Sequence, residues 1–138
     1  MVVMVMDGQG GGIGSVVIKA LRSAVQENVE ILALGTNSAA TARMMKAGAN
    51  RGATGENAIV QTSPKADVIM GPLAVLMAHA MMGEVTPRMA EAITMSNAKK
   101  ILIPLTQEKV TLVGITADPL PHLVEQAVRV VKELAGYV

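Results

Sequence analysis

The chain opens with MVVMVMDGQGGGIGSVVIKALRS at residues 1–23, a stretch that combines three patterns. Val2 to Met6 form an apolar run, as in a short strand that is buried on both faces. Asp7 follows this run, and five of the next seven residues are glycine. Apolar residues then recur at the spacing of an amphipathic helix. The stretch therefore predicts a strand, a glycine turn (residues 8–14) and a helix in direct succession.

Strand-like and helix-like segments alternate along the rest of the chain. This alternation is typical of an α/β domain with a mainly parallel sheet, and the length of 138 residues fits one domain over residues 1–138. The polar segment 49–57 is expected to be an irregular loop. Segments 99–105 and 109–115 are predicted strands that can pair as an antiparallel hairpin near the C-terminal end. Further strands are predicted at 28–37 and 65–72, and helices at 38–47, 58–62, 73–82, 86–96 and from 118 or 120 to 135.

The composition argues against membrane, nucleic-acid and thiol chemistry. No run of about 18 apolar residues is present, although 51% of the residues are hydrophobic. The net charge is +1 and Tyr137 is the single aromatic residue, so neither a basic patch nor a stacking platform for nucleic acid is expected. No cysteine is present, which excludes disulfides and thiolate ligands. We expect a cytoplasmic protein with neither a membrane nor a nucleic-acid partner.

The apolar content also bears on assembly. The chain has 11 methionines and no Phe or Trp, so flexible methionine must fill irregular gaps in the core. So much apolar surface in a small domain suggests that part of it covers a subunit interface, and we expect a homo-oligomer. The two histidines are isolated from one another, with no carboxylate at the spacing of a metal site, and no metal site is expected. His79 lies in the apolar segment 73–82 and is expected to be a core or interface residue.

The glycine turn is the strongest functional signal. A loop that leaves a strand of a parallel sheet at its carboxyl end lies where ligands bind. The helix after the turn offers unpaired N–H groups to an anion, and glycine lets the backbone approach a phosphate closely. The alternative is a turn whose glycines serve tight packing alone. The candidate ligand-binding residues here are Gly8, Gly10, Gly11, Gly12, Ile13, Gly14 and Ser15.

The spacing of the glycines distinguishes between the common nucleotide loops. It does not fit Gly-x-Gly-x-x-Gly, and no lysine precedes Ser15 as a Walker A loop requires. Gly8, Gly12 and Gly14 do fit Gly-x-x-x-Gly-x-Gly, which resembles the nucleotide loop of short-chain dehydrogenases. The Tyr-x-x-x-Lys of those enzymes is absent, since the only tyrosine is Tyr137. Dehydrogenase chemistry is therefore disfavoured, while binding of a phosphate or a nucleotide, including NAD(P), stays open.

Further polar residues are expected at the same edge of the sheet. Thr36, Asn37 and Gly71 lie where predicted strands end, and the carboxyl ends of parallel strands meet at one edge. Segment 49–57 can fold over this edge, where Arg51 suits a bidentate contact with phosphate. A solvated surface loop is the alternative for that segment. Thr36, Asn37, Arg51 and Gly71 therefore join the candidate ligand-binding residues.

Asp7 fits a phosphate loop least well, because an ionised carboxylate repels a bound phosphate. It can accept N–H bonds from the glycine turn and hold the turn in shape, bind a ribose hydroxyl, or recruit Mg²⁺. We favour the first role, because it needs no further partner. For an enzyme at this site, Asp7 and Glu56 are the candidate acid–base residues. Glu84 and Arg88 are assigned either to the same edge or to an interface.

Six segments of the sequence point to a known family. They are DGQGGGIG, ALGTNSAAT, KAGANRGATGENAI, GPLAVLMAHAMMGEVTP, KKILIP and PLPHLV. Together they resemble a bacterial family of small proteins catalogued as a domain of unknown function. The resemblance covers essentially the full length and implies a stand-alone, three-layer Rossmann-like domain. A weaker likeness exists to methylglyoxal synthase, in the order Gly-Thr, Ala-Thr-Gly and Gly-Pro, but the aspartates of that enzyme are not matched.

Three functional hypotheses follow. The first is a protein that binds a nucleotide or another phosphorylated metabolite at the glycine turn, with Arg51, Thr36 and Asn37 closing over the phosphate. The second is a lyase or isomerase that acts on a small phosphorylated substrate at the same site. The third is a regulatory or structural oligomer in which the glycines serve packing.

Overall fold

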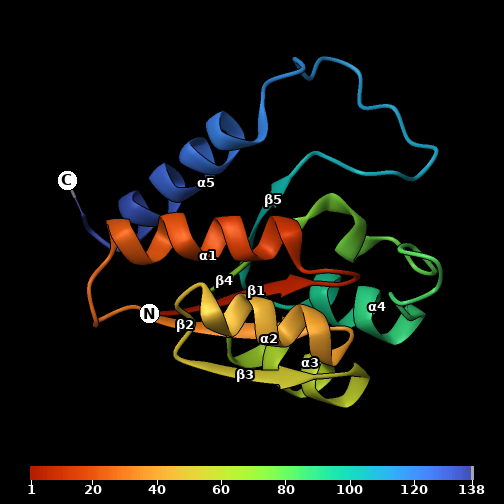
Figure 1. The fold of residues 1–138 in the computed structure, drawn as a ribbon, viewed down its shortest axis with the longest axis horizontal. Coiled ribbons are helices and arrows are strands. Elements are labelled where there is room, and N and C mark those ends of the chain that lie inside the picture. Colours follow the sequence, from red (N-terminus) through yellow and green to blue (C-terminus); the bar gives the residue numbers. More distant parts are fainter. Residues whose placement is uncertain (138) are drawn as a thin grey trace.

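The computed structural model describes residues 1–137 and contains a five-stranded sheet with helices on both faces (Figure 1). Helices α1, α2 and α5 cover one face, and α3 and α4 cover the other. Among residues 1–137, no helix has the length and apolar character that crossing a membrane requires. The elements are β1 (Val2–Asp7), α1 (Gly12–Ala24), β2 (Glu30–Gly35), α2 (Ser38–Lys46), β3 (Arg51–Thr54), α3 (Glu56–Thr62), η1 (Ser63–Lys65), β4 (Val68–Pro72), η2 (Leu73–Leu76), α4 (Pro87–Met95), β5 (Lys99–Ile103) and α5 (Leu120–Leu134).

The strand order is β3-β2-β1-β4-β5, and all neighbouring strands are parallel. The chain moves outward from β1 to β3 and then returns to the other side of β1 as β4. The direction of winding therefore reverses between β1 and β4, and a crevice forms there outside the carboxyl ends of the strands. This arrangement is Rossmann-like and confirms the predicted α/β class with a parallel sheet.

The alternation of side chains along β1 explains why the sheet is covered on both faces. Val3 and Val5 contact the layer that contains α1 and α5, whereas Met4 and Met6 contact the layer that contains α4. All four side chains are completely buried. Because both faces of the strand are buried, its sequence is apolar throughout rather than alternating.

The first and last helices pack against each other on one face of the sheet (Figure 1). Val17 and Leu21 of α1 share a core cluster with Val124, Val128 and Val131 of α5, and all five side chains are buried. The helix predicted from 118 or 120 to 135 is therefore confirmed. It completes a core that the first helix begins.

Three sequence-based predictions are wrong. Residues 109–115 form no strand, and β5 pairs only with β4, so the predicted hairpin is a long loop that leaves the body of the domain (Figure 1). Local β-propensity does not form a strand without a partner edge. The predicted loop at 49–57 contains the edge strand β3, whose four residues are all exposed and carry no alternating pattern.

The helix predicted at 73–82 is also absent. Only η2 forms, and residues 77–86, here called the methionine lobe, follow as an irregular segment. Three of its residues other than glycine, namely His79, Met81 and Met82, have positive φ angles of 70°, 57° and 56°. A right-handed helix cannot contain left-handed residues, so the helical spacing of the apolar side chains was misleading here.

A substitution at Gly71 of β4 tests how closely the backbones of β1 and β4 approach each other. A Cβ atom at this position would lie 2.3 Å from the carbonyl oxygen of Met6, a backbone atom that cannot move away cheaply. We expect Gly71→Ala to lower the free energy of unfolding by about 1–3 kcal/mol, the usual cost of overpacking.

Gly52→Ala in the edge strand β3 is the matched control. The three atoms nearest to its Cβ belong to the side chains of Met45 and Thr41, at 2.9–3.0 Å, and side chains can shift more easily than a carbonyl of the sheet, so the loss should be smaller than for Gly71→Ala. Urea denaturation measures both variants, and equal losses for the two would contradict the close approach at Gly71.

Candidate functional site

The Asp7 carboxylate closes the glycine turn from the inside. Its Oδ1 accepts the Gly8 N–H at 2.8 Å, and its Oδ2 accepts the Gly14 N–H at 2.7 Å. Asp7 is only 4% exposed. The carboxylate thus lies beside the first turn of α1, where the helix dipole favours negative charge. This confirms the favoured role of Asp7, which is to hold the turn in shape.

Burial sets the protonation behaviour of Asp7. Burial raises the pKa of Asp7 above its usual value and outweighs the N–H bonds from Gly14 and Gly8, which lower it. The nearby Glu84 carboxylate raises the pKa further. Asp7 therefore takes up a proton more readily than an ordinary aspartate does.

Three glycines of the turn are required by packing. A Cβ at Gly8 would lie 2.6 Å from the sulfur of Met81, and one at Gly14 would lie 2.6 Å from the sulfur of Met44. Gly11 has a left-handed φ of 71°, and its Cβ would lie 2.9 Å from the carbonyl oxygen of Ala40. For these positions the packing alternative is sufficient.

Gly10 and Gly12 are different, because packing does not require them. The atom nearest to a Cβ at either position is Nη1 of Arg43, at 3.8 Å and 3.7 Å. Neither residue has a left-handed φ. Within residues 1–137, the N–H groups of Gly10 and Gly12 have no hydrogen-bond partner. Two backbone donors are therefore left for a ligand.

These two glycines face a cleft of ≈ 660 Å³ at the crevice between β1 and β4. Its walls are the glycine turn, Pro72 at the end of β4, Ala74 after this strand, the methionine lobe, and residues 105–108 after β5. This volume lies within the range of about 300–1,000 Å³ that is usual for small-molecule sites. Ile13 lines the cleft as predicted, whereas the Ser15 hydroxyl donates to the Gly12 carbonyl inside α1.

Left-handed residues gather at this cleft. Within the described part of the chain, the residues other than glycine with positive φ are Gln9, His79, Met81 and Met82, and all four line the cleft. Such residues are uncommon and cluster at ligand sites, where the surrounding structure holds them in place. His79 is exposed here, so it is not a core residue, and its predicted interface position stays a prediction.

Glu84 of the methionine lobe ties the glycine turn to the end of β2. Its Oε1 accepts hydrogen bonds from Thr36 Oγ1 at 2.6 Å, from Asn37 Nδ2 at 2.8 Å and from the Gln9 N–H at 2.8 Å. Burial raises the pKa of Glu84, but these hydrogen bonds outweigh it and leave the pKa below its usual value. Glu84 therefore stays ionised where Asp7 is more readily protonated.

The hydrogen bonds to Glu84 give Thr36 and Asn37 a different role from the predicted contact with a bound phosphate. Both residues lie at the carboxyl edge as predicted, but their side chains are engaged by Glu84, and Asn37 also caps α2. Neither residue lines the cleft. That they close over a bound phosphate stays a prediction, which this arrangement does not favour. The sequence did not decide whether Glu84 lies at the carboxyl edge of the sheet or at an interface, and the structure places it at this edge.

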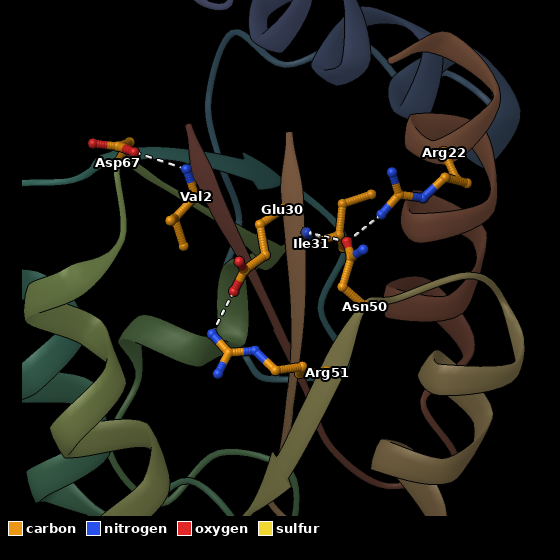
Figure 2. A network of polar contacts seen from close by, with 7 residues as sticks. All are labelled: Val2, Arg22, Glu30, Ile31, Asn50, Arg51 and Asp67. Atoms are coloured by element: carbon orange, nitrogen blue, oxygen red, sulfur yellow. Dashed lines mark hydrogen bonds and ion pairs between the residues drawn. The ribbon is translucent and has the colours of Figure 1, made fainter. Parts of the chain in front are cut away.

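Arg51 lies at the opposite edge of the sheet. It is the first residue of β3, and because β3 is parallel to β2, its side chain lies at the amino edge beside Glu30 (Figure 2). Val2 and Asp67 meet at the same edge, where the Asp67 carboxylate accepts the Val2 N–H at 2.7 Å (Figure 2). The expectation that Arg51 contacts a ligand at the glycine turn is wrong, since segment 49–57 begins as a strand rather than a loop.

Two further candidates also lie outside the cleft. Glu56 follows β3 at the carboxyl edge but forms an ion pair with Arg88 of α4 at 3.6 Å. Gly71 serves the close approach of β1 and β4. Within residues 1–137, no group of three or more His, Asp or Glu side chains is arranged to hold a metal ion.

Sequence reasoning missed two residues of the site. Arg43 of α2 is exposed and donates from Nη1 to the Gly10 carbonyl at 3.3 Å. Glu108, in the loop after β5, accepts the Met81 N–H at 2.8 Å and links the two sides of the cleft. Both contacts join segments that are far apart in the chain, so no local spacing could reveal them.

A known protein family covers nearly the whole chain. The chain matches the family model described as "Domain of unknown function (DUF3842)" over residues 2–136. The chain belongs to this family. No curated protein sequence matches it. The family match confirms the resemblance that the six sequence segments indicated.

Two solved structures are similar to this member of the family. A dodecameric FMN-dependent Ubix-like decarboxylase from Escherichia coli O157:H7 has a TM-score of 0.55 and 15% sequence identity, with 98% of this chain and 93% of that chain covered. A universal stress protein in complex with cAMP has a TM-score of 0.41 and 21% identity, with 72% and 94% covered. At these identities the first likeness shows a shared fold.

The opposite pKa shifts of Asp7 and Glu84 predict opposite pH dependences. Because the native pKa of Asp7 is raised, the native state binds more protons than the unfolded state, and the contribution of Asp7 to stability falls as pH rises through that pKa. The stability of the wild type relative to Asp7→Asn should therefore decrease from acidic to neutral pH.

Glu84→Gln is the control with the opposite sign. Because the native pKa of Glu84 is lowered, Glu84 contributes stability at pH values above its usual pKa, and this contribution is lost as pH falls. The stability of the wild type relative to Glu84→Gln should therefore increase as pH rises. Urea denaturation across this pH range measures both differences. Slopes of the same sign for the two variants would contradict the assignment.

Proposed function

We propose that the protein binds a nucleotide or another phosphorylated small metabolite in the cleft at the glycine turn. The observation that carries the proposal is the free pair of N–H groups at Gly10 and Gly12, which packing does not explain. Backbone N–H groups at the start of a helix are a common anion site. Asp7 holds the turn but leaves these two donors unused.

Arg43 supplies positive charge beside the same donors. Its Nη1 lies close to both Gly10 and Gly12, and no lysine or arginine lines the cleft itself. A phosphate at the two N–H groups would be within reach of this guanidinium, which offsets the repulsion from the Asp7 carboxylate.

The Ubix-like decarboxylase that shares this fold is FMN-dependent, so flavin mononucleotide is one candidate ligand. NAD(P) is the other cofactor class left open by the sequence. A screen should therefore include flavin, adenine and nicotinamide nucleotides as well as sugar phosphates.

An enzymatic role is a second candidate, favoured by the raised pKa of Asp7 at the base of the cleft. A carboxyl group with such a pKa can act as an acid or base in a lyase or isomerase reaction. Because Asp7 also holds the turn, Asp7→Asn tests this role only if ligand affinity is measured beside turnover. Lost turnover with retained affinity supports it, and unaffected turnover removes Asp7 from the mechanism.

A homo-oligomer is the third candidate, and it is compatible with the other two. Large apolar side chains are exposed in the loop after β5 and on the methionine lobe, which is a feature of interaction surfaces. They include Met82 at 95% and Val113 at 96% exposure, together with Leu105, Val110, Leu112 and Ile115.

Bulky residues at the two free glycines test the binding site. Gly12→Leu and Gly10→Leu should retain the fold, since no backbone atom lies within 4 Å of the new Cβ in either case outside the helix itself, and they should abolish binding. A ligand at 100 times its Kd stabilises the wild type by about 2.7 kcal/mol, which thermal-shift measurement detects readily.

Ala39→Leu, an equivalent change at an exposed position in the first turn of α2, should retain binding. Binding that survives in both glycine variants would place the ligand elsewhere. If FMN, AMP, NAD(P) and sugar phosphates all fail to shift the wild type, the proposed function is wrong.

Arg43→Ala tests the charge beside the glycines. Loss of one charge-assisted hydrogen bond, about 1.5–3 kcal/mol, should weaken binding of a phosphorylated ligand by roughly ten- to a hundredfold. The unphosphorylated analogue should be unaffected. Lys46→Ala on the same helix is the control, and titration calorimetry gives the affinities. An equal effect of the two variants would remove Arg43 from the site.

A further inference from the structure

The side of the glycine turn that faces β2 is closed. In a sheet of this strand order, a dinucleotide lies across the crevice with one half over each half of the sheet. One of its nucleosides therefore needs open space outside the carboxyl end of β2. In this protein the methionine lobe occupies that place.

Glu84 and Met81 fill the space from the lobe. Oε1 of Glu84 is bound by Thr36, Asn37 and Gln9, so the end of β2 is joined to the turn through one carboxylate oxygen. Asn37 also donates to the Gln9 carbonyl at 2.9 Å. The Met81 side chain is only 8% exposed, and its sulfur lies against Gly8.

The cleft opens in the other direction. None of its walls comes from β2, α2 or β3. From Gly10 and Gly12 it extends past the end of β4 toward residues 105–108. A ligand anchored by its phosphate at the two N–H groups has room over β4 and β5 alone.

The walls of the cleft beyond the glycine turn suit a heterocyclic ring. Pro72, Met82 and Leu105 provide apolar walls, while Thr106 and Gln107 provide hydrogen-bonding groups beside them. Apolar walls with a few placed polar groups are the usual lining of a small-molecule site, and a planar heterocycle offers apolar faces and polar edges that match them. A bare sugar phosphate would leave these apolar walls uncovered.

We propose that the cleft accepts a single mononucleotide and that Glu84, with Met81, excludes dinucleotides by closing the β2 side. This inference rests on the proposed function and narrows it to one ligand class. Glu84 acts here as a specificity residue, because it fills the space that the second nucleoside would need.

Matched pairs of ligands test the inference on the wild-type protein. Titration calorimetry with FMN against FAD, and with AMP against NAD, compares each mononucleotide with a dinucleotide that contains it. We expect at least one mononucleotide to bind, and to bind ten times or more tightly than its dinucleotide. No binding by any of the four, with binding of a sugar phosphate, would overturn this inference alone, whereas failure of the sugar phosphates as well would contradict the proposed function. A dinucleotide that binds as tightly as its mononucleotide would overturn only the selectivity.

A double variant tests the residues that are held responsible. Met81→Ala with Glu84→Ala should open the β2 side and reduce the preference for the mononucleotide at least threefold. Glu56→Ala, which removes a carboxylate at the same edge but outside the cleft, should leave the preference unchanged. A purely structural role would weaken both ligands of a pair equally, and an unchanged ratio in the double variant would therefore overturn the assignment. If the double variant fails to fold, the single variant Glu84→Ala replaces it, because it empties part of the same space: a reduced preference supports the assignment, and an unchanged ratio overturns it.

Discussion

The structure of the site depends on one buried carboxylate. Asp7 ends β1, and its two oxygens accept the N–H groups of Gly8 and Gly14 across the glycine turn. Without this acceptor, two buried backbone donors would lose their partners, at about 1–3 kcal/mol each. The turn is therefore ordered before any ligand binds, so the free energy of binding is not reduced by the entropy that ordering the turn would cost.

The elements that were predicted correctly are those whose side chains are buried in a regular pattern. β1 and β4 have apolar runs because both faces are covered, and α5 has an apolar stripe because one face packs on α1. β3 was not predicted, because its four residues are exposed and only backbone pairing with β2 makes this segment a strand. The methionine lobe was predicted as a helix because its apolar residues have helical spacing, but several of its residues have a left-handed backbone conformation.

The candidate site was predicted in part for a related reason. The glycine turn and the role of Asp7 are local, so a short stretch of sequence contains the whole of their chemistry. Arg51 was misplaced because its edge of the sheet depends on where β3 begins. Glu84 could not be placed, since its partners Thr36 and Asn37 lie 48 and 47 residues away in the chain.

The packing of α5 against α1 has a consequence for how the protein is made. Val17 and Leu21 lie near the start of the chain, yet Val124 and Val128, which cover them, are synthesised about a hundred residues later. Throughout translation the apolar stripe of α1 lacks its partner helix, and chaperones recognise such exposed apolar surface. This layer of the core can therefore close only after α5 has left the ribosome, whereas the β1–β2 pair can form much earlier.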